Sequence, residues 1–312
     1  MSDLVVQVDH LTKDFGPVRA VDDLSFTVTP GRVTGFLGPN GAGKTTTLRV
    51  LLGLAAPTSG TATIGGLTYA DLPHPSRVVG AAIESTGFHP GRKARDHLRV
   101  LAPQVGVPES RADEVLATVG LSEVSDRRVG GYSMGMRQRL ALAATLLGDP
   151  GVLLLDEPAN GLDPEGIAWL RTFLRILAGQ GRTVLVSSHV LAEVQQTVDD
   201  VVIITKGRLV HASPLAELAA ISPTVAVTSP DVAGLERLVT ERGWKRAGGP
   251  ATPEPPGPDE PQGPRTVLLQ DVTAQEVGAA AFAAGIELHE LARREAQLEQ
   301  TFLELTEGGA GR

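Results

Sequence analysis

The sequence contains no cysteine among its 312 residues. This absence excludes disulfide scaffolds, thiolate nucleophiles and cysteine-based zinc sites. Long apolar runs are missing as well, because the longest wholly apolar stretch is Val277–Ile286. A helix that crosses a bilayer needs about 20 such residues. The first segment, MSDLVVQVDHLTKDF, is acidic where a signal peptide is basic. We therefore expect a chain that neither spans a membrane nor is exported through a signal peptide.

The sequence also lacks the basic excess that is typical of nucleic-acid-binding proteins. Its net charge of −8 divides into −2 for residues 1–220 (20 basic, 22 acidic) and −6 for residues 221–312 (8 basic, 14 acidic). We therefore predict no nucleic-acid partner. Hydrophobic residues make up 42% of the chain, which suffices for a buried core, and the length favours two structural units.

A segment rich in proline and glycine interrupts the second part of the chain. Residues 248–264 contain seven prolines and four glycines. Proline lacks an amide donor and fixes φ, so we expect a solvated loop there. The surrounding pattern predicts strands at 224–228, 265–270 and 286–291, and helices at 232–242, 274–284 and 293–305. We predict a small α+β domain at residues 221–312, after a larger domain at residues 1–220.

Strand and helix patterns alternate in the larger part. The pattern predicts strands at 32–37, 152–155 and 183–187, and helices at 45–54 and 164–181. The four aliphatic residues Val152–Leu155 are typical of a strand that is buried on both faces. Strands that are separated by helices indicate an α/β fold with a largely parallel core sheet.

Residues 38–45, GPNGAGKT, fit the pattern G-x-x-x-x-G-K-[ST] of a phosphate-binding loop. Between a strand and a helix, such a loop directs backbone N–H groups and the positive end of the helix at phosphate oxygens. Lys44 is then expected to reach the β- and γ-phosphates, and Thr45 to ligate Mg²⁺. An ordinary glycine-rich turn is the alternative. The residues predicted to hold the phosphates are Gly38, Pro39, Asn40, Gly41, Ala42, Gly43, Lys44, Thr45 and Thr46.

Two acids, Asp156 and Glu157, follow the buried strand at 152–155. They are expected at the same sheet edge as the phosphate loop. An acid at this place holds Mg²⁺. A second acid can orient or deprotonate an attacking water molecule. A solvated turn before Pro158 is the alternative, but together with the phosphate loop the two acids indicate hydrolysis of the bound nucleotide.

The segment Tyr132–Arg139, YSMGMRQR, lies between the phosphate loop and the two acids. It resembles the signature motif of ATP-binding cassette (ABC) ATPases, and Ser133 and Gly135 match the serine and the second glycine of that motif. Ser133 can cap the helix that follows, so that free N–H groups point at an anion. The resemblance implies that this anion is the γ-phosphate of ATP on a second copy of the chain. A plain capped helix is the alternative.

Four further positions match the family or depart from it. Asp163, in the segment NGLD, resembles the D-loop aspartate that crosses the dimer interface, and His189 resembles the switch histidine that contacts the γ-phosphate. Phe15 resembles the aromatic residue that stacks on adenine, with core packing as its alternative. The glutamine loop of the family would place Gln at position 84, where this chain has Glu84. A carboxylate there can still ligate Mg²⁺.

Met134 and Met136 are a second departure from the family, whose signature motif more commonly has Gly and Gln at these two positions. Both departures, and the ending EAQLEQTFLELT, resemble the branch of bacterial cassettes that drives antibiotic and drug export, including bacitracin-type and anthracycline-type resistance transporters. The resemblance implies the fold of a P-loop ABC cassette. This fold is α/β, with a largely parallel core sheet, an antiparallel β part and a helical signature subdomain, and here a small α+β domain follows.

The resemblance further implies Mg²⁺-dependent ATP hydrolysis. The catalytic residues would be Lys44, Glu157 and His189, and the metal ligands Thr45, Glu84 and Asp156. Two copies of the chain would form a head-to-tail dimer, each signature closing on the ATP of the other. The dimer would drive an integral-membrane permease at the cytoplasmic face of the membrane. The contact would lie in the residue-84 loop, at the turn formed by residues 89–93.

The main alternative is a cassette ATPase outside transport, of the translation or repair type. This chain has a single cassette, and residues 53–130 are too short and contain too much proline for the long coiled coil of repair cassettes. A metabolic phosphotransferase would have no use for the signature, the D-loop and His189 in that order. A third alternative is a regulatory module whose acidic loop binds a basic partner. We instead interpret this loop as a solvated spacer.

Overall fold

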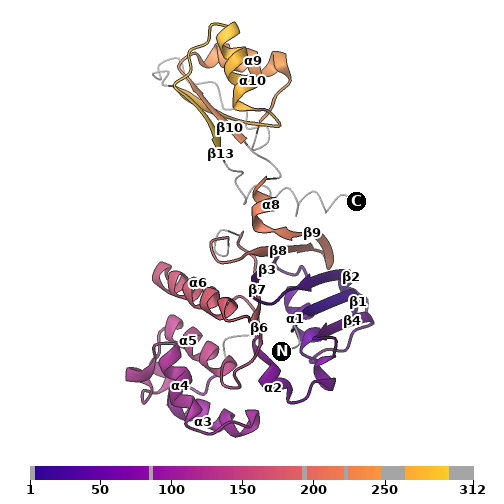
Figure 1. The fold of residues 1–312 in the computed structure, drawn as a ribbon, viewed down its shortest axis with the longest axis vertical. Helices are drawn as coiled ribbons and strands as arrows, with labels where there is room; N and C mark the ends of the chain where they lie inside the picture. The colour runs from indigo at the N-terminus through magenta and orange to yellow at the C-terminus, as the bar shows by residue number, and fades with distance from the viewer. Residues whose placement is uncertain (1–3, 84–86, 192–194, 221–223, 247–263, 295–312) are drawn as a thin grey trace. The chain divides into compact units, whose positions relative to one another are not determined.

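The computed structural model describes residues 4–83, 87–191, 195–220, 224–246 and 264–294. Contacts divide the chain into two compact units, one ending at Leu215 and the other beginning at Ala216 (Figure 1). None of the helices in the described ranges has the length and apolar character needed to cross a bilayer. Glu84 and most of the helix predicted at 293–305 lie outside the described residues.

The core of the first unit is a six-stranded sheet. Its strands, in spatial order, are β5 (Val79–Ala82), β6 (Val152–Leu155), β7 (Thr183–Ser188), β3 (Val33–Leu37), β8 (Asp200–Thr205) and β9 (Arg208–Pro214). Neighbouring strands from β5 to β8 are parallel, and β9 is an antiparallel edge. Strands β3, β6 and β7 are buried along their whole length, which explains their continuous apolar runs. The predicted α/β fold with a largely parallel core sheet is confirmed.

An antiparallel sheet lies beside this core, in the order β2 (Val18–Val28), β1 (Val6–Phe15) and β4 (Ser59–Ile64). Its buried side chains share one hydrophobic cluster with helix α1 (Lys44–Leu51) and the core sheet. The rings of Phe26 and Phe36, for example, lie 5.1 Å apart across the two sheets. The cluster therefore fixes α1, and with it the loop before α1, between the sheets.

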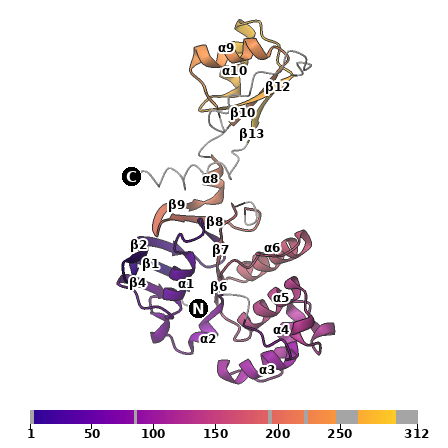
Figure 2. The same ribbon diagram turned by 180° about the vertical axis from the view of Figure 1, so that it is seen from behind.

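Helices occupy the other side of the core sheet in both views (Figures 1 and 2). They are α3 (Ala94–Val105), α4 (Arg111–Thr118), α5 (Met134–Thr145) and α6 (Pro164–Gly179), while the short α2 (Pro75–Val78) leads into β5. Helix α6 buries Leu170, Phe173, Leu174 and Leu177, which form one helical face. Ser133 and Asp163 cap α5 and α6 by accepting hydrogen bonds from backbone N–H groups of their first turns. Both helices thus begin at residues that the sequence predicts to be functional.

The second unit begins in the short helix α8 (Leu215–Ala220), after which its elements have the βαββαβ order of a ferredoxin-like fold. Its elements are β10 (Thr224–Ser229), α9 (Val232–Arg242), β11 (Lys245–Arg246), β12 (Arg265–Gln270), α10 (Ala274–Ala283) and β13 (Glu290–Arg294). The strands form an antiparallel sheet in the order β11-β12-β10-β13. Its core joins Val225 and Leu269 of the sheet to Leu235 and Val277 of the helices.

The prediction of a strand at 286–291 is partly wrong, because β13 runs from Glu290 to Arg294. Ile286 and Leu288 pack instead against the cluster that contains Leu238 of α9. Strand β13 is set by its pairing with β10, in which Arg294 lies opposite Thr224. The apolar residues before β13 thus serve the core from a loop, which a periodicity argument cannot distinguish from a strand.

Candidate functional site

The loop at residues 38–43 connects the buried strand β3 to helix α1. A Cβ atom on Gly38 would lie 2.4 Å from the carbonyl oxygen of Ile204, and one on Gly43 would lie 2.5 Å from that of Ala20. Gly43 also has a φ of +106°, which favours glycine. The loop can therefore approach its neighbours only with glycine at these two positions, and α1 starts directly after it with Lys44.

The Lys44 side chain is buried, and its Nζ donates hydrogen bonds to the carbonyl oxygens of Gly38 (2.6 Å) and Pro39 (3.3 Å). It also forms an ion pair with Glu157, with 3.5 Å between Nζ and Oε1. Burial lowers the pKa of Lys44, while the negative charges of Glu157 and Asp156 act in the opposite direction. The ammonium group is therefore held inside the loop and faces a carboxylate.

Asp156 joins three elements through its two carboxylate oxygens. Thr45 of α1 donates its hydroxyl to Asp156 Oδ2 at 2.7 Å, and Ser187 of β7 donates to Oδ1. Hard oxygen donors of this kind suit Mg²⁺, which commonly takes one or two protein groups and completes its shell with phosphates and water. No group of three or more His, Asp or Glu that could hold a metal occurs within the described ranges. Thr45 and Asp156 thus fit an ion that arrives with a nucleotide.

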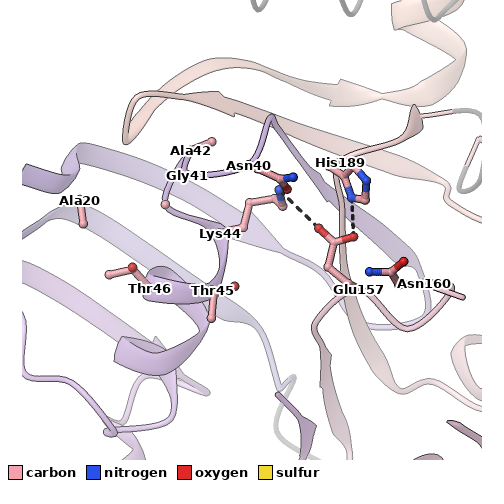
Figure 3. A pocket seen from close by; sticks show the side chains of 11 residues that line it. Ala20, Asn40, Gly41, Ala42, Lys44, Thr45, Thr46, Glu157, Asn160 and His189 are labelled. Carbon is pink, nitrogen blue, oxygen red and sulfur yellow. Dashed lines mark hydrogen bonds and ion pairs between the residues drawn. The ribbon is translucent and has the colours of Figure 1, made fainter. Parts of the chain in front are cut away.

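The Glu157 carboxylate lies between His189 and Lys44 (Figure 3), and its backbone is held by Ser187. Its Oε2 is hydrogen bonded to Nδ1 of His189 at 2.7 Å, and its backbone N–H donates to the Ser187 hydroxyl at 2.9 Å. Its φ of +49° is uncommon for a residue other than glycine. A non-glycine residue persists in this region only where its surroundings hold it, and such positions cluster at functional sites. The Glu157 carboxylate is therefore presented in a fixed orientation.

Lys44, Glu157 and His189 line one hollow of about 570 Å³, whereas the predicted metal ligand Asp156 is not among its lining residues. Figure 3 shows Lys44, Glu157 and His189 gathered at one end and Thr46 at the other. Of the residues predicted for the phosphate loop, Gly38 and Pro39 do not line the hollow, but their carbonyl groups hold Lys44. The lining residues are Ala20, Asn40, Gly41, Ala42, Gly43, Lys44, Thr45, Thr46, Glu157, Asn160 and His189.

A second hollow, of about 340 Å³, contains the other predicted residues, Ser133, Gly135 and Asp163. It lies at the first turns of α5 and α6, where the Ser133 hydroxyl accepts from the N–H of Met136 (3.2 Å) and Asp163 Oδ1 from that of Gly166 (2.9 Å). The two hollows share no lining residue. The structure therefore brings the predicted residues together as two separate groups.

Phe15 stands apart from both groups. It lies at the end of β1 with 51% of its surface exposed, which excludes core packing, and Lys13 Nζ lies 4.7 Å from its ring centre. Sequence reasoning missed Ser187, which contacts both acids, and the pair formed by Arg139 and Trp169, which lie 4.2 Å apart beside the second hollow. The serine pair at the end of the predicted strand at 183–187 was the available signal for Ser187.

The fold and the first hollow define a P-loop protein that binds and hydrolyses a nucleoside triphosphate. The sequence model described as "ABC transporter" matches residues 21–160. The bacitracin transport ATP-binding protein BcrA of Bacillus licheniformis is 43% identical over 217 residues, which cover 69% of this chain and 71% of that protein. The lantibiotic transport ATP-binding protein SrtF of Streptococcus pyogenes is 35% identical over 208 residues, 66% of this chain and 89% of that protein.

The chain therefore belongs to the ATP-binding proteins of the ABC transporter family. Its cassette binds and hydrolyses ATP, and it is the ATP-binding subunit of a transporter. A solved structure described as the ATP binding subunit of an ABC transporter superposes with a TM-score of 0.63 at 27% identity, covering 69% of this chain and 92% of that one. Residues 223–299 match a domain of unknown function (DUF8746). The function of the second unit is thus not given by its relatives.

Proposed function

We propose that this chain works as a head-to-tail dimer whose Mg²⁺-dependent ATP hydrolysis drives a separate membrane permease. The observation that carries the proposal is the division of the predicted site between two hollows that share no lining residue. The first hollow holds Lys44 and Glu157, and the second holds Ser133 and Asp163. In the dimer, each ATP would lie in the first hollow of one chain and would be contacted by the second hollow of the other chain.

The first hollow performs the chemistry. Lys44 bonds two backbone carbonyl groups and faces Glu157, so the phosphates of ATP would bind a cation that the loop already holds in place. Glu157 would orient a water molecule for attack on the γ-phosphate and accept its proton, while His189 keeps the carboxylate in position. Thr45 and Asp156 would hold Mg²⁺, which neutralises charge on the phosphates.

The second hollow supplies stabilisation to the ATP of the other copy. The first turn of α5 offers backbone N–H groups and the positive end of the helix dipole, both of which favour an anion. Asp163 is fixed at the start of α6 beside it. We therefore place Ser133 and Gly135 on the γ-phosphate of the partner copy, and Asp163 at the interface between the copies.

Complementation between two inactive variants tests this arrangement. Lys44→Ala disables the first hollow and Ser133→Arg the second, so each variant alone is expected to lack ATPase activity. A mixture forms heterodimers in which one composite site combines the intact Lys44 of one chain with the intact Ser133 of the other. We expect phosphate release to return in the mixture. A mixture as inactive as its components would refute the head-to-tail dimer.

Glu157→Gln separates binding from hydrolysis. The amide keeps the shape of the side chain but cannot accept the proton of the attacking water. We expect ATP to hold this variant as a dimer, seen as a doubled mass in light scattering, with hydrolysis nearly abolished. Turnover at the wild-type rate would assign the proton acceptor to another residue, with Asp163 and His189 the next candidates.

We assign the permease contact to the turn at residues 89–93. All five residues are exposed, and the turn is held by hydrogen bonds from the Arg92 N–H to the His89 carbonyl group (3.0 Å) and from the Gly130 N–H to that of Pro90 (2.8 Å). It is therefore a fixed, exposed turn that presents Arg92 and Lys93, the latter paired with Asp126 at 3.4 Å. Reversing the charges of Arg92 and Lys93 should uncouple the permease while nucleotide binding remains.

Co-purification from membranes and transport measure this effect. Charge reversal of two exposed arginines on α9, at positions 237 and 242, is the matched control. Normal transport by the turn variant would show that the permease contact does not lie in this turn.

We assign the ATPase to residues 1–220, treat residues 221–312 as an appendage, and place the chain at the cytoplasmic face of the membrane. Its similarity to BcrA and the departures in its sequence support export of an antibiotic, drug or lipid-like compound.

A further inference from the structure

Sulfur is scarce in this chain and is concentrated beside the second hollow. The sequence contains no cysteine and three methionines, Met1, Met134 and Met136. Met134 and Met136 both line the second hollow. Because no thiol competes for oxidants, thioethers are the only sulfur groups in the chain that a peroxide can attack.

Met134 is the more accessible of the two. It is the first residue of α5 and 52% of its surface is exposed, whereas Met136 is half-buried. Its side chain lies along the loop that contains Asp163, since a Cβ atom on Gly161 would be 3.3 Å from Met134 Cγ and 3.9 Å from Sδ. An exposed thioether thus packs on the loop that contributes to the proposed interface.

We propose that Met134 is an oxidation site through which hydroperoxides lower the ATPase rate. A peroxide transfers one oxygen atom to Met134 Sδ: the O–O bond breaks, an S–O bond forms, the thioether becomes a sulfoxide and hydrogen peroxide leaves as water. Methionine sulfoxide reductases reverse the step. The site therefore acts as a reversible brake, and the inference rests on the head-to-tail dimer proposed above.

The effect follows from where the new oxygen lies. A sulfoxide oxygen carries partial negative charge, so at the first turn of α5 it competes with the incoming γ-phosphate for the positive end of the helix. The polar group also replaces an apolar contact with Gly161 and loosens the loop that ends at Asp163. Both changes oppose closure of one copy on the ATP of the other.

The experiment compares the wild-type chain with Met134→Leu and Met136→Leu before and after hydrogen peroxide. Each treated rate is divided by the untreated rate of the same variant, and peptide mass spectrometry locates the added oxygen. We expect wild type and Met136→Leu to lose activity about threefold to fivefold, a factor of the size of helix-terminus electrostatics. The ATPase rate of Met134→Leu should be the same before and after treatment. Sulfoxide reductases should restore the ATPase rate of the treated wild-type chain.

A second measurement uses Glu157→Gln with ATP, in which the closed dimer should protect Met134 from oxidation. An unchanged ATPase rate with Met134 fully oxidised would overturn this inference alone, as would equal losses in wild type and Met134→Leu. A chain with no ATPase activity before treatment, or failed complementation between Lys44→Ala and Ser133→Arg, would overturn the proposed function as well.

Discussion

Ser187 provides the sharpest test of how the two acids are positioned. It is fully buried on β7, donates its hydroxyl to Asp156 and accepts the N–H of Glu157 at 2.9 Å. Ser187→Ala removes a hydrogen bond to a charged group, which contributes about 1.5–3 kcal/mol, and a neutral one, which contributes about 0.5–1.5 kcal/mol. We therefore expect the free energy of unfolding to fall by about 2–4 kcal/mol.

Ser187→Ala should also slow catalysis. Glu157 has a positive φ, a conformation that costs about 1–3 kcal/mol, and Ser187 helps to hold it there. Without the serine the residue can relax and move its carboxylate. A misplacement of about 1 Å can cost about a hundredfold in rate. We expect kcat for ATP hydrolysis to fall about 10–100-fold, with a smaller change in KM, because Lys44 and the loop glycines remain in place.

Steady-state phosphate release as a function of ATP concentration measures both constants, and denaturant unfolding measures stability. Thr183→Val is the matched control, since Thr183 is fully buried on the same strand and donates its hydroxyl to the Leu4 carbonyl group (2.7 Å), away from both acids. It should lose about 1 kcal/mol of stability and no activity. A Ser187→Ala chain with kcat within a factor of about two of wild type would refute the positioning argument.

Three further predictions concern the phosphate loop, the pH dependence of stability, and the contact between Arg139 and Trp169 at the second hollow. Gly43→Ala should abolish ATP binding in a nucleotide-binding assay, because its Cβ would lie 2.5 Å from a backbone carbonyl oxygen, whereas Gly41→Ala has open space and should retain more of it. Burial lowers the pKa of His97 below its ordinary value of about 6.5, so the unfolded chain takes up the proton first as pH falls. Stability should therefore decrease as pH falls below about 6.5, and chemical unfolding of His97→Phe should show a shallower decrease; an identical slope would contradict this. Arg139→Gln should remove the cation–π contact with Trp169, at 4.2 Å, and lower stability by about 0.5–1 kcal/mol, measured by unfolding followed through tryptophan fluorescence.

The parts of the site that the sequence predicted are those whose chemistry is local. The phosphate loop needs glycines, a lysine and a hydroxyl within eight consecutive residues, and Asp156 and Glu157 follow a strand whose burial is visible in its composition. The contacts of Ser187 with the two acids could not be predicted, because they require β6 and β7 to be neighbours, and only the assembled sheet specifies this pairing. The contact between Arg139 and Trp169 could not be predicted for the same reason, because it joins two helices, α5 and α6, that become neighbours only in the folded chain.

The second unit shows the same limit for the fold. The predicted helix at 232–242 and strand at 265–270 are confirmed, because each has a clear period and polar or glycine boundaries. Strand β11, with only Lys245 and Arg246, has no periodicity to read and exists through its pairing with β12. Strand β13 is likewise determined by a tertiary partner, so its position could not be derived from its own residues.

The pairing of β10 with β13 also has a consequence for how this unit is carried by the chain. Thr224, the first residue of β10, and Arg294, the last residue of β13, lie opposite each other in the sheet. Partners of this kind have Cα atoms about 4.5–5.5 Å apart, a gap that a single residue can bridge. The start of β10 and the end of β13 therefore lie side by side. The span from residue 224 to residue 294 can therefore be exchanged as a single piece, because its two ends lie side by side and need only one point of attachment.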